Sequence, residues 1–178
     1  MAKSKSFPDA LNDQIANEFS AAMQYIGIAV HYDSETLPRL ASFFYRQALE
    51  ERTHAMMMIQ YLLDVNEPVQ IPDIKGQQTK FDDDVAAVRM ALEQEKRVGE
   101  EIYKLFELAR QTKDYRAEQF MQWFVSEQVE EVALMQDVLN VVERSRDNLL
   151  LVEEYIAREG PGEGGTTGAP PEAGASAG

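Results

Sequence analysis

The sequence predicts an all-α protein built as a four-helix bundle, with a long connection between the second and third helices and a short fifth helix. Three observations support this fold class. Gly and Pro are nearly absent from three long spans. Apolar residues recur within those spans at intervals of three and four, which is the spacing of one helix face. The breaks between helices are short, long and short in that order, an arrangement that suits a bundle with one crossover.

The first helix is expected over about residues 8–33, and it begins after Ser6 in a capping-box-like segment with Pro in the first turn. The second is expected over about residues 38–65, after the turn SETLP. The segment NEPVQIPDIKGQQT, residues 66–79, then carries two Pro and a Gly and lacks a helical pattern. A connection of this length can travel the whole bundle, so the second and third helices can run parallel.

The third helix is expected over about residues 81–111 with Thr79 as its cap, and the fourth from after Asp114 to about residue 145. The segment NLLLVEEYIARE, residues 148–159, indicates a short fifth helix. Residues 1–159 therefore form one domain. Residues 160–178 are rich in Gly, Pro, Ala, Thr and Ser, and we expect them to be a disordered tail because they offer little apolar surface to bury.

A polar residue interrupts the apolar stripe of each long helix. Each interruption lies about 15 to 18 residues from the tight turn that joins its helix to its partner, which is about 22 to 27 Å along the bundle. All four helices can therefore bring these residues to one level near the middle. The residues are Glu18, Glu51 with His54, Glu95, and Gln128 with Glu131.

Ionised carboxylates gathered in an apolar core would lose hydration and repel one another, at a cost of several kcal/mol each or a large rise in pKa. A multivalent cation removes this cost. The chain has no Cys, so a metal here would have oxygen and imidazole ligands, and four carboxylates with one imidazole suit two iron ions. The alternative is that the stripes are misphased and these residues are surface carboxylates.

The charge balance and the lack of a long apolar segment disfavour two classes of partner, nucleic acids and membranes. A formal net charge of −14 disfavours nucleic acid and anionic membranes, which both attract basic surfaces. The N-terminal segment MAKSKSFPDAL has no apolar core of a signal peptide, and no apolar run reaches membrane-spanning length. We therefore expect a cytoplasmic protein that does not bind membranes or nucleic acid.

Four motifs resemble the helix signatures of prokaryotic non-haem ferritins, in particular iron-storage ferritins of actinobacterial type. They are ANEFSAAMQY, ALEERTHAM, LEQEKRV and QWFVSEQVEEVALM, and the resemblance covers about residues 8–158. The fourth helix has Gln128-x-x-Glu131 where the general di-iron bundle has Glu-x-x-His, which resembles ferritins rather than bacterioferritins or rubrerythrins. Arg52 follows Glu51 at the position where a bacterioferritin haem would need Met, so no haem is expected.

The resemblance implies a ligand set for two iron ions. The first would be held by Glu18, Glu51 and His54. The second would be held by Glu51, Glu95 and Glu131, so that Glu51 bridges the pair.

The resemblance also implies residues around this pair. Gln128 would orient a water or oxygen ligand. Tyr25 would donate a hydrogen bond beside the metal pair and could supply an electron. Glu50, Glu127 and Glu130 match a third iron site, although an acidic solvated face would look the same in the sequence.

The implied function is that of a ferroxidase, which oxidises Fe(II) to Fe(III) with dioxygen or peroxide and deposits ferric mineral in a 24-subunit homo-oligomeric shell. The fifth helix would contact the four-fold axis, and Asp114 and Glu118 are candidates for lining a three-fold channel. Two alternatives remain: a non-catalytic bundle protein, or a mini-ferritin that forms a smaller shell. The fifth helix and the Lys-poor N-terminus disfavour the mini-ferritin.

Overall fold

The structure, a computed structural model, describes residues 5–74, 77–160 and 168–174. The predicted all-α fold is confirmed, and no strand occurs among the residues described. None of the helices described combines the length and apolarity needed to cross a membrane. The elements in chain order are α1 (Phe7–Ser34), α2 (Pro38–Asp64), α3 (Asp84–Thr112), α4 (Tyr115–Arg144) and α5 (Leu150–Glu159).

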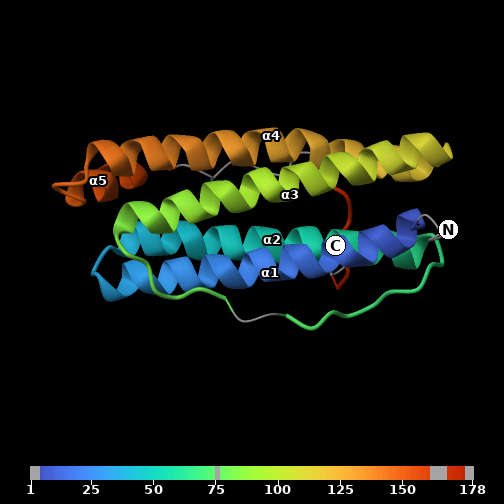
Figure 1. Ribbon diagram of the computed structural model, residues 1–178, viewed down its shortest axis with the longest axis horizontal. Helices are drawn as coiled ribbons and strands as arrows, with labels where there is room; N and C mark the ends of the chain where they lie inside the picture. The colour runs from blue at the N-terminus through green and yellow to red at the C-terminus, as the bar shows by residue number, and fades with distance from the viewer. Residues whose placement is uncertain (1–4, 75–76, 161–167, 175–178) are drawn as a thin grey trace.

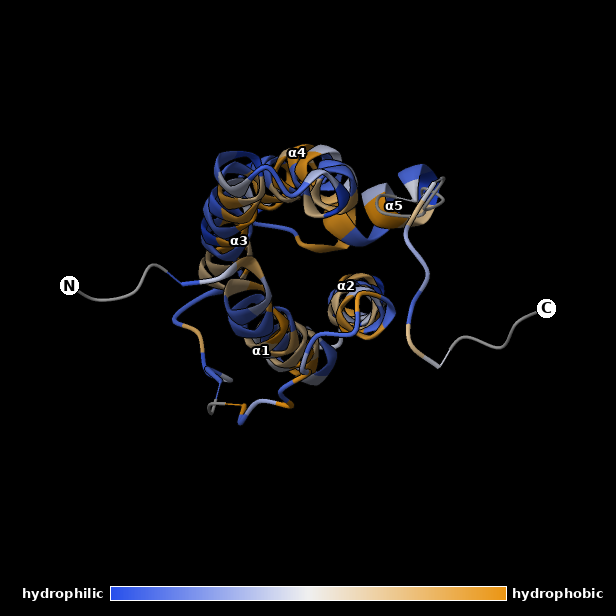
Figure 2. Cartoon of the chain, turned by 90° about the vertical axis from the view of Figure 1, so that its right-hand side faces the viewer, coloured by the Kyte–Doolittle hydropathy of each residue, from blue (hydrophilic) through white to orange (hydrophobic). Residues whose placement is uncertain are grey.

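The four long helices form two antiparallel pairs, α1 with α2 and α3 with α4 (Figure 1). The described parts of the connection between α2 and α3 run beside α1 from one end of the bundle to the other, so α2 and α3 are parallel as predicted. Seen end-on, α1 to α4 surround a common centre, and α5 lies at the α2–α4 side (Figure 2). This arrangement lets every long helix contribute side chains to one central layer.

The start of α3 differs from its prediction. The helix begins at Asp84 rather than near residue 81, and its cap is Asp83 rather than Thr79. The carboxylate of Asp83 accepts a hydrogen bond of 2.6 Å from the backbone N–H of Ala86. An acceptor at this position satisfies one of the free N–H groups of the first turn. The residues before it belong to the extended connection.

That connection is held against α1 by a paired amide contact. The side chain of Gln24 accepts from the backbone N–H of Gln78 at 3.0 Å and donates to its carbonyl at 2.8 Å. Gly27 lies beneath this contact, where a Cβ would stand only 2.7 Å from the carbonyl oxygen of Gln78. A glycine is required here because any side chain would push the connection away from the helix.

The N-terminus of α2 is capped from a distant part of the chain. Leu37, the residue before the helix, has no side chain that can accept a hydrogen bond. The carboxylate of Glu153 in α5 instead accepts from the backbone N–H groups of Arg39 and Leu40 at 2.8 to 3.1 Å. A negative charge at a helix N-terminus also interacts favourably with the helix dipole. Glu153 therefore fixes α5 to the end of the bundle.

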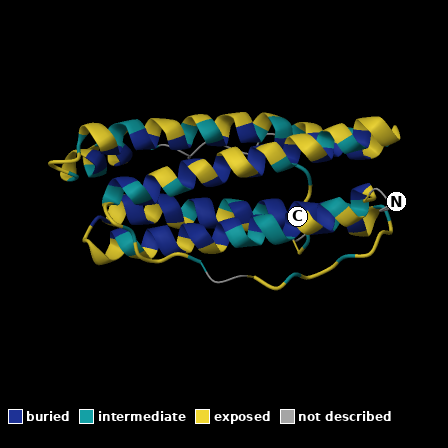
Figure 3. Ribbon diagram, in the orientation of Figure 1, coloured by how far each residue is buried: buried dark blue, intermediate teal, exposed yellow. Residues whose placement is uncertain are grey.

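The buried faces of the helices point inward (Figure 3) and form two apolar clusters. One cluster fills the end of the bundle near α5 and includes Tyr25 and Phe44, and the other fills the opposite end and includes Leu11 and Met121. The apolar spacing also predicts Tyr61 and Phe106 on the inward faces of the second and third helices, but these two side chains are only partly covered. The polar interruptions lie between the two clusters.

Part of the C-terminal segment, for which the sequence predicts a disordered tail, is described by the structure. Residues 168–174 lie against the bundle, where the backbone N–H of Ala173 donates to the carbonyl of Met56 at 3.1 Å. Ala169 and Ala173 pack against the apolar cluster far from α5. Small side chains make this contact possible because they let the backbone approach the helix closely. The rest of the expected tail, residues 161–167 and 175–178, lies outside the residues described.

Candidate metal centre

Six side chains that can bind or orient a metal meet at mid-bundle, as the helix positions predict. They come from all four long helices and are almost fully covered. Their exposed fractions are 1% for Glu18, 2% for Glu51, 5% for His54, 0% for Glu95, 5% for Gln128 and 5% for Glu131. The alternative in which they form a solvated surface is therefore wrong.

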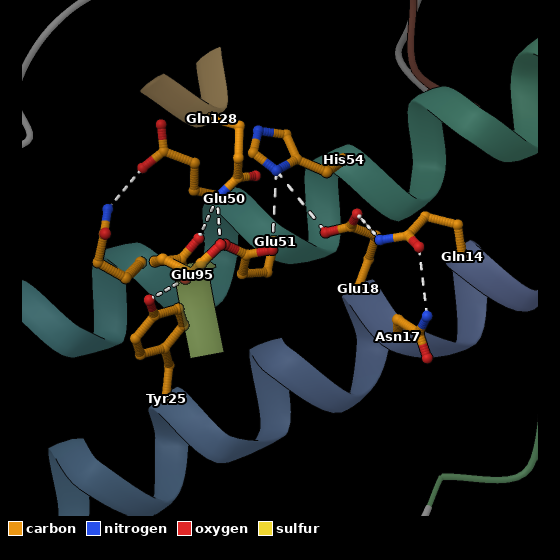
Figure 4. Close-up of polar contacts among 10 residues, drawn as sticks. Gln14, Asn17, Glu18, Tyr25, Glu50, Glu51, His54, Glu95 and Gln128 are labelled. Atoms are coloured by element: carbon orange, nitrogen blue, oxygen red, sulfur yellow. Dashed lines mark hydrogen bonds and ion pairs between the residues drawn. The ribbon is translucent and has the colours of Figure 1, made fainter. Parts of the chain in front are cut away.

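Glu18, Glu51 and His54 form the first group (Figure 4). The Nδ1 atom of His54 lies 3.9 Å from Oε2 of Glu18 and 3.7 Å from Oε2 of Glu51. One ligand atom from each residue lies within 4.8 Å of the others. Both of these carboxylate oxygens are buried and have no hydrogen-bond partner among the residues described. Two carboxylate oxygens without hydrogen-bond partners, together with the nearby Nδ1 of His54, are a suitable cradle for a cation.

Glu50, Glu127 and Glu131 form a second group, whose ligand atoms also lie within 4.8 Å of one another. Glu131 is buried, whereas Glu50 and Glu127 are partly exposed. Oε2 of Glu131 has no hydrogen-bond partner among the residues described, and Glu50 accepts from Gln47 at 2.7 Å. The resemblance implies Glu131 at the second iron and the other two residues in a third site. The grouping therefore shows that residues expected at these two sites lie next to one another.

Glu95 lies between neutral donors rather than in either group. The hydroxyl of Tyr25 donates to one carboxylate oxygen, and Nε2 of Gln128 donates to the other at 2.7 Å and to the Glu95 carbonyl at 3.1 Å (Figure 4). Gly99 makes room for this arrangement, since a Cβ there would stand 2.9 Å from Cγ of Gln128. Tyr25 and Gln128 therefore hold Glu95 in place beside the metal-binding groups.

Glu130 stands apart from both groups and is exposed. Together with Glu127 and Trp123 it lines a cavity of about 1090 Å³ on the face of α4, which Gly168 and Pro170 border from the C-terminal segment. The predicted third-site residues thus divide between a half-buried pair and one carboxylate at the surface.

Burial raises the pKa of the central carboxyl groups, and their mutual repulsion raises it further. The pKa of Glu18 is well above its usual value because of desolvation and the neighbouring Glu51, and that of Glu51 is raised by desolvation and Glu95. Desolvation and several acidic neighbours raise the pKa of Glu131 to about 9. Glu131 is therefore protonated near neutral pH unless a cation holds it in the ionised form.

Residues 8–145 match the Ferritin family, described as a ferritin-like domain. The chain is 46% identical over 168 residues to ferritin BfrB of Mycobacterium tuberculosis, an alignment that covers 94% of this chain and 93% of the relative. It is 35% identical over 145 residues to a bacterial non-heme ferritin of Staphylococcus aureus, which covers 82% and 87% respectively.

The chain belongs to the ferritin family.

Solved structures agree with this assignment. An open-pore ferritin from the hyperthermophilic archaeon Archaeoglobus fulgidus matches with a TM-score of 0.83 and 29% identity, over 88% of this chain and 99% of that chain. The predicted family, a prokaryotic non-haem ferritin, and the predicted ferritin-like bundle are thus confirmed, and the protein is an iron-storage protein.

Three polar residues around the centre of this ferritin were not predicted from the sequence. Gln14 donates to Glu18 at 2.8 Å, and Asn17 donates to both Gln14 and Glu101. Gln14 is four residues before Glu18 on the same helix face, and this spacing is the signal that could have identified it. Asn17 and Glu101 lie on different helices, so only the packing of α1 against α3 brings them together.

Proposed function

We propose that this ferritin is a ferroxidase that binds two Fe(II) ions at mid-bundle and oxidises them before storage. The observation that carries the proposal is a set of buried carboxylate and imidazole atoms between the two apolar clusters, for which the described part of the chain supplies no hydrogen-bond partner. Such groups are costly in a folded core unless they bind a ligand. In a family of iron-storage proteins, Fe(II) is the ligand that accounts for them.

The first Fe(II) would bind to Glu18, Glu51 and His54, which already converge on one point. The second would bind on the other side of Glu51, to Glu95 and Glu131, so that Glu51 bridges both ions. This side of the centre gathers the larger number of carboxyl groups, and burial together with repulsion from Glu50, Glu95 and Glu127 raises the pKa of Glu131. A second dication would relieve this repulsion.

A third iron position next to the pair is supported by the grouping of Glu50 and Glu127 with Glu131. Because Glu131 belongs to the proposed second position as well, the two positions adjoin. From the third position, Glu130 would lead an iron ion on to the cavity on the α4 face. The acidic cavity thus offers a way for iron to leave the bundle towards a mineral.

The oxidation needs little chemistry from the protein. Each Fe(II) gives up one electron, and two electrons with two protons reduce dioxygen to hydrogen peroxide, which can itself serve as an oxidant for a further pair. The protein's part is to hold the two metals close together in a site that excludes most water. Tyr25 donates a hydrogen bond to Glu95 and lies within the same buried layer, where it would hold this ligand in place.

An apolar surface over α1 and α2 supports assembly of the chain into a homo-oligomeric shell. The family resemblance implies that this shell has 24 subunits. Met23, Ile26 and Leu49 are 42%, 38% and 64% exposed, and they line a shallow apolar cavity of about 320 Å³. Monomeric proteins rarely expose contiguous apolar patches of this kind. We assign this face to contact with a second copy of the chain.

Two further expectations become part of the proposal. Arg52 is exposed on α2, and we propose that no haem binds beside Glu51. Asp114 caps α4 through the backbone N–H groups of Arg116 and Ala117, and Glu118 lies 3.6 Å from Arg110. Both acidic residues lie at the start of α4, and we propose that they line the three-fold channel suggested by the resemblance.

The proposal is tested by rapid mixing of the metal-free protein with Fe(II) in air, followed by absorbance of the Fe(III) product. We expect a fast phase that consumes about two Fe(II) per subunit. The variants Glu51→Ala and His54→Ala should lose this phase, whereas Asp137→Asn, an exposed acidic position on α4, should keep it. A fast phase of unchanged rate and amplitude in Glu51→Ala would refute the assignment.

The third position is tested separately with Glu130→Ala. This variant should keep the fast phase and slow the later turnovers, in which iron must leave the pair before new Fe(II) can bind. Later turnovers that match the wild-type rate would show that Glu130 takes no part in the transfer.

A further inference from the structure

A chain of hydrogen bonds leads from the outer face of the bundle to Glu18. Asn17 donates through its Nδ2 to Glu101 on α3 at 2.9 Å and to Oε1 of Gln14 at 3.2 Å. Gln14 then donates through Nε2 to Oε1 of Glu18 at 2.8 Å. Gln14 is 2% exposed and Glu18 is 1% exposed, whereas Asn17 and Glu101 are only partly covered. The contacts around Gln14 and Glu18 are drawn in Figure 4.

The order of donors and acceptors along this chain is determined by its outer end. The carboxylate of Glu101 can only accept, so Asn17 must present its NH₂ group rather than its oxygen. That NH₂ group has two hydrogens, and the second one meets the oxygen of Gln14. The amide of Gln14 is thereby turned so that its own NH₂ group faces Glu18. A residue on α3 thus decides which end of a buried amide on α1 faces the metal centre.

This orientation has a consequence for Glu18. Its Oε1 is held by Gln14, while its Oε2 has no hydrogen-bond partner among the residues described and lies 3.9 Å from Nδ1 of His54. The donor from Gln14 also favours the ionised carboxylate, which is the form that binds metal. The opposite orientation of Gln14 would place an amide oxygen against the carboxylate and repel it.

We propose that Gln14 and Asn17 are positioning residues, which direct one oxygen of Glu18 at the first metal and keep its other oxygen away from it. The inference rests on the proposed function, because it assumes that Glu18 is a metal ligand. Neither residue touches the metal: Gln14 acts through Glu18, and Asn17 acts through Gln14. Removing the hydrogen-bond partner of a metal ligand reduces metal affinity by about 10- to 100-fold in known sites.

Asn17→Asp is the decisive variant because it changes the hydrogen-bonding groups and hardly changes the shape. An aspartate at this position offers only acceptors, so Gln14 turns its NH₂ group towards it and its oxygen towards Glu18. We expect Asn17→Asp and Gln14→Leu each to lower the affinity for the first Co(II) ion by at least about tenfold. Glu101→Gln can still accept from Asn17 through its amide oxygen, and Glu18 still favours a donor from Gln14, so this variant should change the affinity by less than about threefold.

The measurement is calorimetric titration of the chelator-treated, assembled protein with Co(II), which air does not oxidise under these conditions, together with the visible absorption spectrum of bound Co(II). The spectrum reports the ligand geometry, so a change in Glu18 orientation alters it even where the fold is intact. Thermal unfolding of each metal-free variant controls for structure. Gln14→Leu buries an apolar group in place of an amide and could be destabilised for that reason. In that case the result for Asn17→Asp alone decides the test.

Glu51→Ala separates a failure of this inference from a failure of the proposed function. If Glu51→Ala binds Co(II) as the wild type does, the metal centre itself is wrongly assigned. If Glu51→Ala loses binding while Asn17→Asp and Gln14→Leu keep wild-type affinity and spectrum, the positioning role is refuted. An equal loss in Glu101→Gln and Asn17→Asp also refutes it, because Glu101→Gln keeps an acceptor for Asn17 and is expected to leave the affinity near the wild-type value.

Discussion

The most direct test of the buried acidic centre is Glu131→Gln, because its effect on stability should change sign when metal is added. In the metal-free protein this substitution replaces a carboxyl group whose pKa is raised to about 9 with a neutral group of the same shape. The group is buried, so solvent screens it little. We expect the metal-free variant to be more stable than the wild type at neutral pH.

The magnitude follows from the pKa. An unfolded chain ionises this group above about pH 4.5, whereas the folded chain keeps it protonated until about pH 9. The wild-type free energy of unfolding therefore falls as the pH rises through this window. A pH of 7 lies about 2.5 pH units above the pKa of this group in the unfolded chain. The wild-type protein has therefore lost about 3 kcal/mol of unfolding free energy at pH 7. An unpartnered amide in the variant costs about 1–2 kcal/mol, so the expected net gain is about 1–2 kcal/mol.

The assay is guanidinium unfolding of chelator-treated protein at pH 5 and pH 7, at equal subunit concentration because assembly contributes to stability. The gain for Glu131→Gln should be present at pH 7 and lost at pH 5. At pH 5 the solution lies only about 0.5 pH unit above the unfolded-state pKa, which corresponds to about 0.7 kcal/mol and does not exceed the cost of the amide. Added Zn(II) should then stabilise the wild type more than the variant, since only the wild type supplies the extra ligand. Asp137→Asn controls for the loss of one negative charge from α4.

Two results would contradict this reasoning. A metal-free Glu131→Gln protein that is less stable than the wild type at pH 7 would show that the carboxyl group is not strained by burial. Equal stabilisation of both proteins by Zn(II) would show that Glu131 does not contribute to metal binding.

Three further predictions concern residues that support the centre. Glu153→Ala should lower the free energy of unfolding by about 0.5–2 kcal/mol through loss of the α2 cap, whereas an unchanged unfolding midpoint would mean that the cap is not needed. Gly99→Ala should cost about 1–3 kcal/mol and displace Gln128, which unfolding and Co(II) spectra can measure together. Tyr25→Phe should leave Fe(II) binding intact and slow oxidation in rapid mixing, because the hydrogen bond to Glu95 is lost; a wild-type rate would exclude a role in the reaction.

The sequence predicted most of the centre because helical spacing determines which side chains share a face. Glu18, Glu51 and Glu95 interrupt apolar stripes at matched depths, and the structure buries all three. The error at the start of α3 arose from local ambiguity, since Thr79 and Asp83 are both acceptable caps. Only the contact of the connection with α1 shows that residues near Thr79 remain extended.

The sequence by itself determined the helices, their order, the parallel relation of α2 and α3, and the acidic layer at mid-bundle, because these depend on periodicity and on the lengths of the connections. Tertiary structure alone decided how the polar groups pair. The cap of α2 by Glu153, the amide chain from Glu101 to Gln14, and the grouping of Glu131 with Glu50 join residues on different helices. Such contacts depend on how the helices are rotated and packed against one another, and spacing within a single helix carries no record of that rotation.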